Sequence, residues 1–336
     1  MKINIYGAGT WGITVANYLA NKGCDVYVYS RNINSPDFNL GKFNHKPKSI
    51  NRSIVFSYDI NTFNLDYLNI IAVPSSAITE VLRDIYNSRC MISGYNRPLK
   101  YLLLSKGFDI KTGLLPYEIL SKKIYRSDNN IAVLSGPNHA EEIILNKISA
   151  SVIASRCVIF SRDLQKLFSS ESLRIYTSTD VIGVQIGGAV KNVIAIAAGI
   201  ASGLHLGDNA LSALVSRGMN EISLLTHVFK WDSMKKETLF GLSGLGDLIA
   251  TCFSKHSRNK QLGELIATGK PVSESLKQIG MVSEGYYTAK TLYKVISVYN
   301  LDMPICIEVY NILYKNASPS ESLKKLMTRR LINEIY

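Results

Sequence analysis

The sequence predicts an α/β domain with a doubly wound sheet over residues 1–183, followed by an all-helical domain over residues 184–336. Three observations predict this fold class. Short apolar segments typical of strands recur through the first half, separated by stretches long enough for helices. A glycine-rich turn follows the first of these strands at once. After Asp180 the alternation stops, and helical patterns continue toward the C-terminus.

Composition and charge limit the classes of function. A chain of 336 residues with 46% hydrophobic and 19% charged residues is typical of a soluble protein with two domains. The net charge of +12 favours anionic partners. Because the charges form no block and no nucleic-acid motif is visible, we expect a phosphorylated small molecule and no nucleic acid. Five scattered cysteines and no signal peptide predict free thiols in the cytoplasm.

The N-terminus has the pattern strand, glycine turn, helix. Residues 2–6 form a short apolar strand, and the turn Gly7-Ala-Gly-Thr-Trp-Gly12 leads into a helical pattern. In a G-x-G-x-x-G turn, Gly7 allows the tight bend, Gly9 lets the backbone approach a pyrophosphate, and Gly12 lets the helix pack closely on the strand. The helix N-terminus then offers N–H groups to the phosphates. The pattern predicts a Rossmann-type dinucleotide-binding domain over residues 1–183.

Arg31 decides the expected cofactor. The second strand, residues 25–29, ends at Ser30-Arg31, where a site specific for NAD usually has an acidic residue. An arginine there is suited to pair with a 2′-phosphate, so NADPH is expected, with NADH as the alternative. A solvated arginine at a strand end is the simpler interpretation.

Further strands are expected along the first half, and they predict a largely parallel sheet with helices on both faces. In such sheets ligands lie beyond the carboxyl ends of the strands. Residues 32–52 are polar and are predicted to form a long loop. The further strands are expected at residues 53–58, 68–73, 101–105, 131–134, 150–154 and 173–176.

Two strand ends carry candidate site residues. Lys106 follows an apolar run and precedes Gly107, so its side chain is expected to project toward cofactor and substrate. A solvated lysine is the alternative. Gly136-Pro-Asn138 ends the next strand, and acidic residues at 141–142 favour the start of a helix there. N–H groups at this turn are suited to hold an anion.

Lys191 is the only charged residue between Val181 and Leu204, within a long apolar run. The run is long enough to span a membrane, but Lys191, Asn192 and Gln185 would each be costly in lipid. We therefore expect no stable membrane insertion. Two interpretations remain: a lysine paired with a carboxylate, or a catalytic lysine whose pKa is lowered by burial.

Two later segments offer partners for a charged substrate. Asp247 follows a glycine-rich turn at an expected helix start, where it is either an N-cap or the carboxylate partner of Lys191. Ser257-Arg-Asn259 concentrates donors that suit a phosphate, and surface polarity is the alternative. The five histidines show no spacing typical of metal ligands, so no metal site is expected.

Together these motifs resemble the bacterial-type NAD(P)-dependent glycerol-3-phosphate dehydrogenases. The first motif is common to many dehydrogenases, whereas the lysine helix together with the later segments is specific. They occur in the family's order and span nearly the whole chain: Gly7 to Gly12, Ser105-Lys-Gly107, Leu134-Ser-Gly-Pro137, Val190-Lys-Asn-Val-Ile-Ala-Ile-Ala-Ala-Gly199, Gly244-Leu-Gly-Asp-Leu248, Thr251-Cys252, Ser257-Arg-Asn259, Glu284-Gly285 and Thr288-Ala289.

The resemblance implies a Rossmann domain, a helical substrate domain, and interconversion of sn-glycerol 3-phosphate and dihydroxyacetone phosphate for glycerophospholipid synthesis. It implies that Lys191 exchanges the proton, with Lys106 and Asp247 completing the catalytic group. Substrate-binding positions are then Lys106, Gly136, Asn138, Lys191, Asp247, Ser257, Arg258 and Asn259. Cofactor-binding positions are Gly7, Gly9, Thr10, Trp11, Gly12, Arg31, Lys106, Ala140, Arg258, Val282 and Glu284.

The chain departs from the family pattern at Asn138-His139, where Ser or Thr followed by Phe is usual. The amide of Asn138 still offers a donor to a phosphate or hydroxyl, and no function is assigned to His139. One alternative is a dehydrogenase of the 6-phosphogluconate or 3-hydroxy-acid type, although Ser257-Arg-Asn259 favours a small phosphate ester. Another is a nucleotide-sensing protein without activity, which would not need Lys106, Lys191 and Asp247 together. A homodimer stays open.

Overall fold

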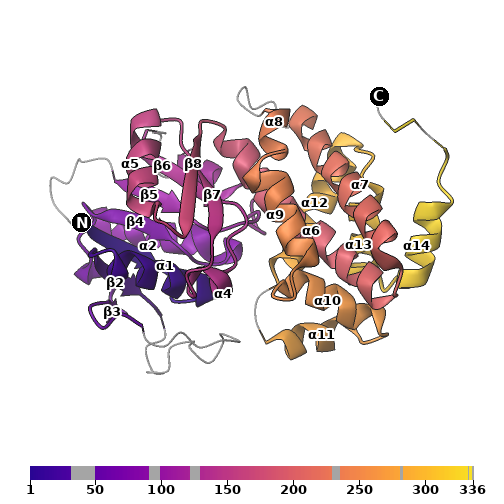
Figure 1. The fold of residues 1–336 in the computed structure, drawn as a ribbon, viewed down its shortest axis with the longest axis horizontal. Coiled ribbons are helices and arrows are strands. Elements are labelled where there is room, and N and C mark those ends of the chain that lie inside the picture. Colours follow the sequence, from indigo (N-terminus) through magenta and orange to yellow (C-terminus); the bar gives the residue numbers. More distant parts are fainter. Residues whose placement is uncertain are drawn as a thin grey trace. The chain divides into compact units, whose positions relative to one another are not determined.

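The computed structural model describes residues 1–31, 50–90, 99–121, 129–228, 235–280, 283–331 and 333–334. The chain divides into two compact units (Figure 1). Unit 1 comprises Met1–Ala189 and Trp231–Asp247, and unit 2 comprises Val190–Lys230 and Leu248–Tyr336. The boundary expected at residue 183 stays a prediction, and the expected loop at residues 32–52 lies almost wholly outside the described residues.

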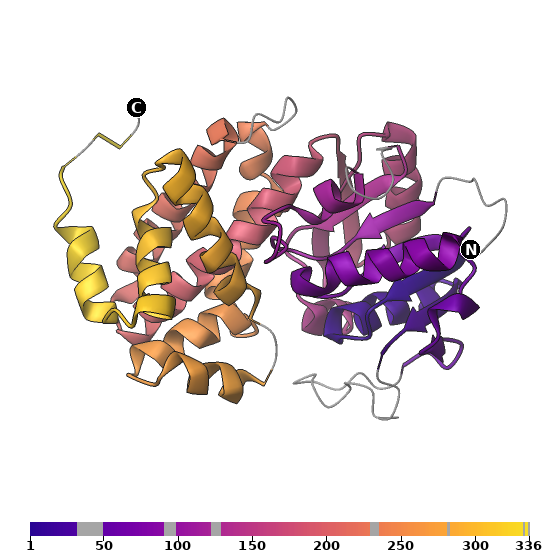
Figure 2. The ribbon, with the colours of Figure 1, turned by 180° about the vertical axis from the view of Figure 1, so that it is seen from behind.

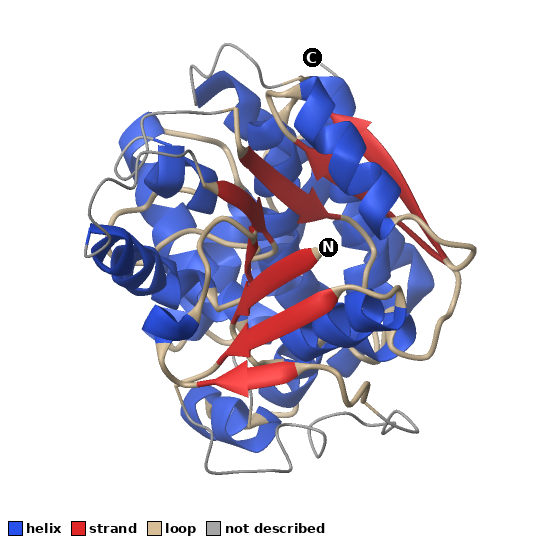
Figure 3. Cartoon of the chain, turned by 90° about the vertical axis from the view of Figure 1, so that its left-hand side faces the viewer, coloured by secondary structure: helices blue, strands red, loops and turns tan. Residues whose placement is uncertain are grey.

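Unit 1 is built on an eight-stranded sheet in the order β3-β2-β1-β4-β5-β6-β7-β8 (Figure 3). Neighbouring strands are parallel except for β6 and β7, which are antiparallel. Every strand expected from the sequence is present, so the largely parallel sheet is confirmed. The strands are β1 Lys2–Tyr6, β2 Asp25–Tyr29, β3 Val55–Ser57, β4 Leu68–Ile71, β5 Lys100–Leu103, β6 Ile131–Ser135, β7 Ser149–Ala154 and β8 Leu173–Ser178.

The strand order has a switch point between β1 and β4. The chain goes from β1 to β2 on one side, and β4 then lies on the other side of β1. Ligands of doubly wound sheets bind beyond the carboxyl ends of the strands at such a point. Here those ends are Tyr6, whose carbonyl accepts from the N–H of Ala72 at 2.8 Å, and Gly7, whose N–H donates to Tyr29 at 3.1 Å.

The core of unit 1 lies where the apolar faces of the helices meet the sheet. Ile3, Ile5 and Val28 are fully buried strand residues, and they share one cluster with Ile13 and Leu19 of α1. Burial of β-branched and leucine side chains of this kind stabilises the packing of helices on the sheet. The helices of unit 1 are α1 Thr10–Asn21, α2 Ile78–Cys90, α3 Pro116–Glu118, α4 Ala140–Ile143, α5 Val158–Phe168 and α8 Lys236–Leu239, with the turns η2 Ile60–Thr62, η3 Ser75–Ala77 and η5 Leu242–Gly246.

In its described residues, unit 2 contains helices joined by short loops and no strand (Figure 2). Helix α6 lies close to α10: a Cβ at Gly199 would lie 1.9 Å from the carbonyl oxygen of Lys260, and one at Gly263 would lie 2.1 Å from that of Ile196. Only glycine permits so close a crossing. Helices α6 Val181–Gly203 and α9 Asp247–Phe253 begin in unit 1, and the others are α7 Gly207–Val228, α10 Arg258–Ala267, α11 Val272–Ile279, α12 Glu284–Tyr299, α13 Pro304–Lys315 and α14 Pro319–Met327.

Helix α6 is the long apolar helix expected around Lys191. By length and composition alone, Val181–Gly203 passes as a membrane span, but 94% of its most apolar window is buried inside the fold. A helix that is apolar on all sides and covered by protein is the core helix of a large domain. The long apolar run around Lys191 is therefore a buried helix of the fold.

Candidate functional site

The glycine turn after β1 has the geometry that a dinucleotide requires. Gly7 has φ of 117°, and a Cβ there would lie 2.6 Å from the carbonyl oxygen of Ala72. A Cβ at Gly12 would lie 2.0 Å from the carbonyl oxygen of Gly7, so only glycine lets α1 approach the strand. An added Cβ at Gly9 meets nothing within 4 Å, and this open space suits an approaching pyrophosphate.

Helix α1 presents its N-terminus at the same turn. The N-cap residue is Gly9, which has no side chain that could accept from the first N–H groups, and Thr10 and Trp11 begin the helix. The first backbone N–H groups of a helix have no partner within it, so they form a ready site for phosphate oxygens. The residues present therefore fit a dinucleotide, with Gly9, Thr10 and Trp11 at the phosphate position.

Arg31 forms an exposed ion pair with Glu80 after β2. The guanidinium lies 3.0 Å from the carboxylate, and the side chains are 57% and 60% exposed. Exposed pairs contribute roughly 0–1 kcal/mol, so an incoming phosphate competes easily with Glu80. The preference for NADPH stays a prediction.

Lys106 is the centre of a polar cluster in unit 1. Its ammonium donates to the carbonyl oxygen of Gly136 at 3.0 Å, to Oδ1 of Asn138 at 2.8 Å and to Oδ2 of Asp247 at 2.9 Å. The side chain of Lys106 is 16% exposed and that of Asp247 is 3% exposed. All four are predicted site residues. Lys106 follows β5, Gly136 and Asn138 follow β6, and Asp247 begins α9, so the fold brings together residues that are far apart in the sequence.

Close backbone packing fixes this cluster. Gly136 has φ of 133°, and a Cβ there would lie 3.0 Å from Cα of Ser151 on β7. A Cβ at Gly188 would lie 2.7 Å from Oγ of Ser135. A Cβ at Gly187 would lie 2.7 Å from the carbonyl oxygen of Ser243, so α6 packs directly on the turn that precedes Asp247.

Lys191 lies within unit 2, where its ammonium donates to Oγ1 of Thr251 at 2.8 Å. Both side chains are buried. The sequence left Asp247 as either an N-cap or the partner of Lys191, and the structure shows that its carboxylate accepts from Lys106. A pairing of Asp247 with Lys191 stays a prediction.

Asn259 joins three helices of unit 2. Its Nδ2 donates to Oδ1 of Asn192 on α6 at 2.9 Å, and its Oδ1 accepts from the hydroxyl of Ser283 at 2.7 Å and from the N–H of Gly285 at 3.0 Å. A Cβ at Gly285 would lie 2.5 Å from the carbonyl oxygen of Asn192. Asn259 is therefore a structural link that leaves one N–H for a ligand.

The other predicted residues stand at helix starts. Ser257 is the N-cap of α10, and its hydroxyl accepts from the N–H of Lys260 at 3.3 Å. Arg258 is the first residue of that helix and is half-buried. Ala140 begins α4 and Glu284 begins α12. Val282 lies outside the described residues.

Sequence reasoning assigned no role to Thr251, Asn192 or Ser151. Thr251 follows Asp247 by one helical turn on α9, so the two share a face of that helix. This spacing is a signal that would have identified Thr251. Nothing in the sequence indicates that Ser151, on β7, reaches Asn138.

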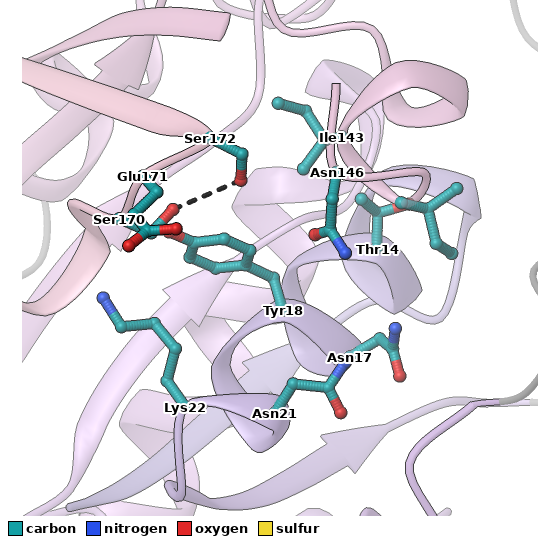
Figure 4. Close-up of a pocket in the computed structure, with 11 residues that line it drawn as sticks. Thr14, Asn17, Tyr18, Asn21, Lys22, Ile143, Asn146, Ser170, Glu171 and Ser172 are labelled. Atoms are coloured by element: carbon teal, nitrogen blue, oxygen red, sulfur yellow. Dashed lines mark hydrogen bonds between the residues drawn. The ribbon is translucent and has the colours of Figure 1, made fainter. Parts of the chain in front are cut away.

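The structure also contains a polar groove of about 540 Å³ on α1 (Figure 4). It includes none of the predicted site residues. Tyr18 lies in its wall and donates to the carbonyl of Phe168. The lining residues are Thr14, Asn17, Tyr18, Asn21, Lys22, Ile143, Ile144, Asn146, Ser170, Glu171 and Ser172.

The chain is similar to known proteins over its whole length. Residues 2–160 match the model of the NAD-dependent glycerol-3-phosphate dehydrogenase N-terminus, and residues 180–324 match that of the C-terminus. Glycerol-3-phosphate dehydrogenase (NAD(P)+) of Staphylococcus carnosus is 37% identical over 335 residues, covering 98% of each chain. The corresponding protein 1 of Lactobacillus delbrueckii subsp. bulgaricus is 39% identical over 340 residues, covering 99% of each.

A solved structure agrees with this match. The crystal structure of glycerol-3-phosphate dehydrogenase from Coxiella burnetii has a TM-score of 0.87 and 32% identity, covering 98% of this chain and 99% of that one. The Rossmann-type fold expected from the glycine turn is thereby confirmed. The chain belongs to the family of NAD-dependent glycerol-3-phosphate dehydrogenases.

Proposed function

We propose that this protein interconverts sn-glycerol 3-phosphate and dihydroxyacetone phosphate, with NADPH as the preferred cofactor and NADH as the alternative. The observation that carries the proposal is Lys191, a lysine with 5% of its surface exposed and the only charged residue of its helix. Burying an ammonium group is costly, and such groups concentrate at functional sites. Membership of the family supports the substrate and the cofactor.

Lys191 acts as the general acid and base. When dihydroxyacetone phosphate is reduced, its ammonium gives a proton to the C2 oxygen as that oxygen gains negative charge. The bound nicotinamide supplies the hydride for C2. In the reverse direction the neutral amine of Lys191 takes the proton from the alcohol. Thr251 accepts a hydrogen bond from Lys191 and so orients the amine.

The other predicted residues are proposed to bind the substrate or the cofactor. Lys106 and Asp247 form the buried charge pair that completes the catalytic group. Gly136, Ser257, Arg258 and Asn259 are proposed to contact substrate together with these residues, whereas Asn138, which the resemblance places among them, has its amide bound to Lys106 and Ser151. Gly7, Gly9, Thr10, Trp11, Gly12, Arg31, Lys106, Ala140, Arg258, Val282 and Glu284 are proposed to contact the cofactor.

The enzyme is proposed to work in the cytoplasm, where its product would feed glycerophospholipid synthesis. Of the five cysteines in the sequence, Cys24, Cys157, Cys252 and Cys306 have described side chains, and these four are free thiols, as a reducing compartment would allow. Small molecules are its proposed partners, and a homodimer remains a proposal whose test is the mass of the protein in solution.

The test is the loss of NADPH absorbance with dihydroxyacetone phosphate, beside parallel assays with NADH, with a 3-hydroxy acid and with 6-phosphogluconate. Turnover limited to dihydroxyacetone phosphate supports the proposal, and intact cofactor binding without turnover contradicts it. Arg31→Ala should raise KM for NADPH more than KM for NADH, because it removes the partner of the 2′-phosphate. Arg83→Ala, which removes an exposed charge on α2, is the control.

A further inference from the structure

We propose that Asn138, held in place by Ser151, is a positioning residue for Lys106 and not a ligand of the substrate phosphate. The inference deepens the proposed function and rests on it for the role of Lys106. Asn138 is 9% exposed. Its Oδ1 accepts from the ammonium of Lys106 at 2.8 Å, and its Nδ2 donates to Oγ of Ser151 at 3.3 Å.

Chemistry fixes the orientation of this amide. A lysine ammonium has three hydrogens and no acceptor, so only the carbonyl end of Asn138 can face it. The amide nitrogen Nδ2 then donates to the hydroxyl oxygen of Ser151 on β7. A flipped amide would direct its N–H groups at the positive charge of Lys106. Asn138 therefore links β7 to the lysine that follows β5.

The ammonium of Lys106 uses all three of its hydrogens. Its acceptors are the carbonyl of Gly136, the carboxylate of Asp247 and the amide of Asn138. The three acceptors together fix both the place and the rotation of the group. Loss of Asn138 would leave one N–H in a largely buried position without its present acceptor, and such a loss is unfavourable. The ammonium would then shift away from its present position.

The same contacts limit Asn138 as a phosphate ligand. Its carbonyl oxygen is an acceptor and would repel a phosphate oxygen. One hydrogen of Nδ2 is directed at Ser151, which leaves a single N–H. The bond that Oδ1 of Asn138 accepts from the ammonium of Lys106 is the stronger of its two hydrogen bonds, because a hydrogen bond from a charged donor is about twice as strong as a neutral one.

The experiment separates the two roles with Asn138→Ser and Ser151→Ala. A serine at 138 keeps a hydroxyl donor for phosphate but is too short to keep both present contacts. Positioning predicts that kcat falls on the order of 10-fold or more in Asn138→Ser, because small displacements of a catalytic group are costly. KM for dihydroxyacetone phosphate should change less than about threefold, since substrate binding is retained. Ser151→Ala should shift kcat in the same direction by less.

A readout without substrate or cofactor accompanies the kinetics. In ¹⁵N-labelled protein, the side-chain ammonium of Lys106 should exchange its hydrogens slowly with water, because it is hydrogen-bonded and largely buried. Lys106→Met identifies the signal. Asn138→Ser should speed this exchange, whereas Asn220→Ser, an exposed asparagine on α7, should leave it unchanged.

Two outcomes would overturn the inference. One is a rise of KM with unchanged kcat in Asn138→Ser, which would make Asn138 a substrate ligand. The other is an unchanged Lys106 signal in both Asn138→Ser and Ser151→Ala. Because the exchange measurement does not depend on turnover, it tests the positioning even if the proposed substrate proves wrong.

Discussion

The ammonium nitrogen of Lys191 lies 2.8 Å from the hydroxyl oxygen of Thr251, and both side chains are buried. The two residues come from α6 and α9, separated by 60 positions in the chain. A hydroxyl that accepts from an ammonium fixes the direction of one N–H and leaves two for other acceptors. Thr251 stands one helical turn after Asp247, so a single short helix carries both the threonine and the carboxylate.

Replacing Lys191 should stop the chemistry and leave the fold in place. We expect Lys191→Ala to fold but to lose kcat by on the order of 10²-fold or more, because the variant lacks the proposed proton donor. Steady-state kinetics with dihydroxyacetone phosphate measures the loss, and NADPH binding checks that the site is intact. Lys294→Ala, which removes an exposed lysine of α12, is the control. Retained kcat would remove the proton role from Lys191.

Breaking the buried pair of Lys106 and Asp247 should lower stability. Asp247→Asn keeps the shape but removes the negative charge, so the ammonium stays largely buried without its counter-ion. We expect the free energy of unfolding to fall by about 3 kcal/mol. In contrast, Glu142→Gln breaks an exposed pair with Lys147, whose N···O distance is 3.8 Å, and should cost less than about 1 kcal/mol. Urea denaturation compares the two, and equal losses would contradict the prediction.

Glu221 should make stability depend on pH. Its carboxylate oxygens accept from the N–H groups of Ile305 at 2.7 Å and Cys306 at 3.0 Å, at the start of α13. Burial raises the pKa of Glu221 from 4.5 to about 7, although these two hydrogen bonds lower it. Because the folded-state pKa lies above the unfolded value, this contribution to stability is present below pH 4.5 and is lost as pH rises through 7.

The size of that effect follows from the pKa difference. The step from 4.5 to about 7, at about 1.4 kcal/mol per unit, gives a loss of about 3 kcal/mol between these pH values. Glu221→Gln should flatten the pH dependence of unfolding over this range, and the exposed Glu237→Gln should not. Denaturation at several pH values measures both. Identical pH profiles for wild type and Glu221→Gln would refute the role of Glu221.

Two glycines of the first turn should separate binding from folding. A Cβ at Gly9 meets nothing within 4 Å, so Gly9→Ala should fold with unchanged stability and bind NADPH more weakly, because the methyl group occupies the phosphate position. A Cβ at Gly12 would lie 2.0 Å from a backbone oxygen, so Gly12→Ala should lower stability itself. Thermal unfolding and cofactor titration of each variant give the comparison, which fails if both glycines behave alike.

Local patterns were enough to predict the elements that position the site. The apolar run 2–6 and the run around Lys191 have the lengths and residue types of a buried strand and a buried helix, and the structure contains both. Gly7 and Gly12 were predicted from spacing alone because their roles depend on neighbours close in sequence. Such features are determined by backbone sterics within one strand, turn and helix unit.

Contacts between distant segments were not predictable in the same way. That Asn138 accepts from Lys106 depends on β5 and β6 being neighbours in the sheet and on Gly136 bending the chain. That Asn259 joins α6 to α12 depends on how three helices pack. The antiparallel pairing of β7 with β6 also has no local signal, since the apolar pattern of a buried strand is the same whether its neighbour is parallel or antiparallel.

The chain leaves unit 1 after Ala189 and returns to it for Trp231–Asp247. No single cut in the gene therefore separates the two units. A recombination event between residues 189 and 231 would join Lys106 from one parent to Asp247 from another, and the buried charge pair would have to form between residues of different ancestry. Such a chimaera keeps the pair only where the first parent supplies the lysine and the second supplies the aspartate, so the two segments of unit 1 must be inherited as a compatible set.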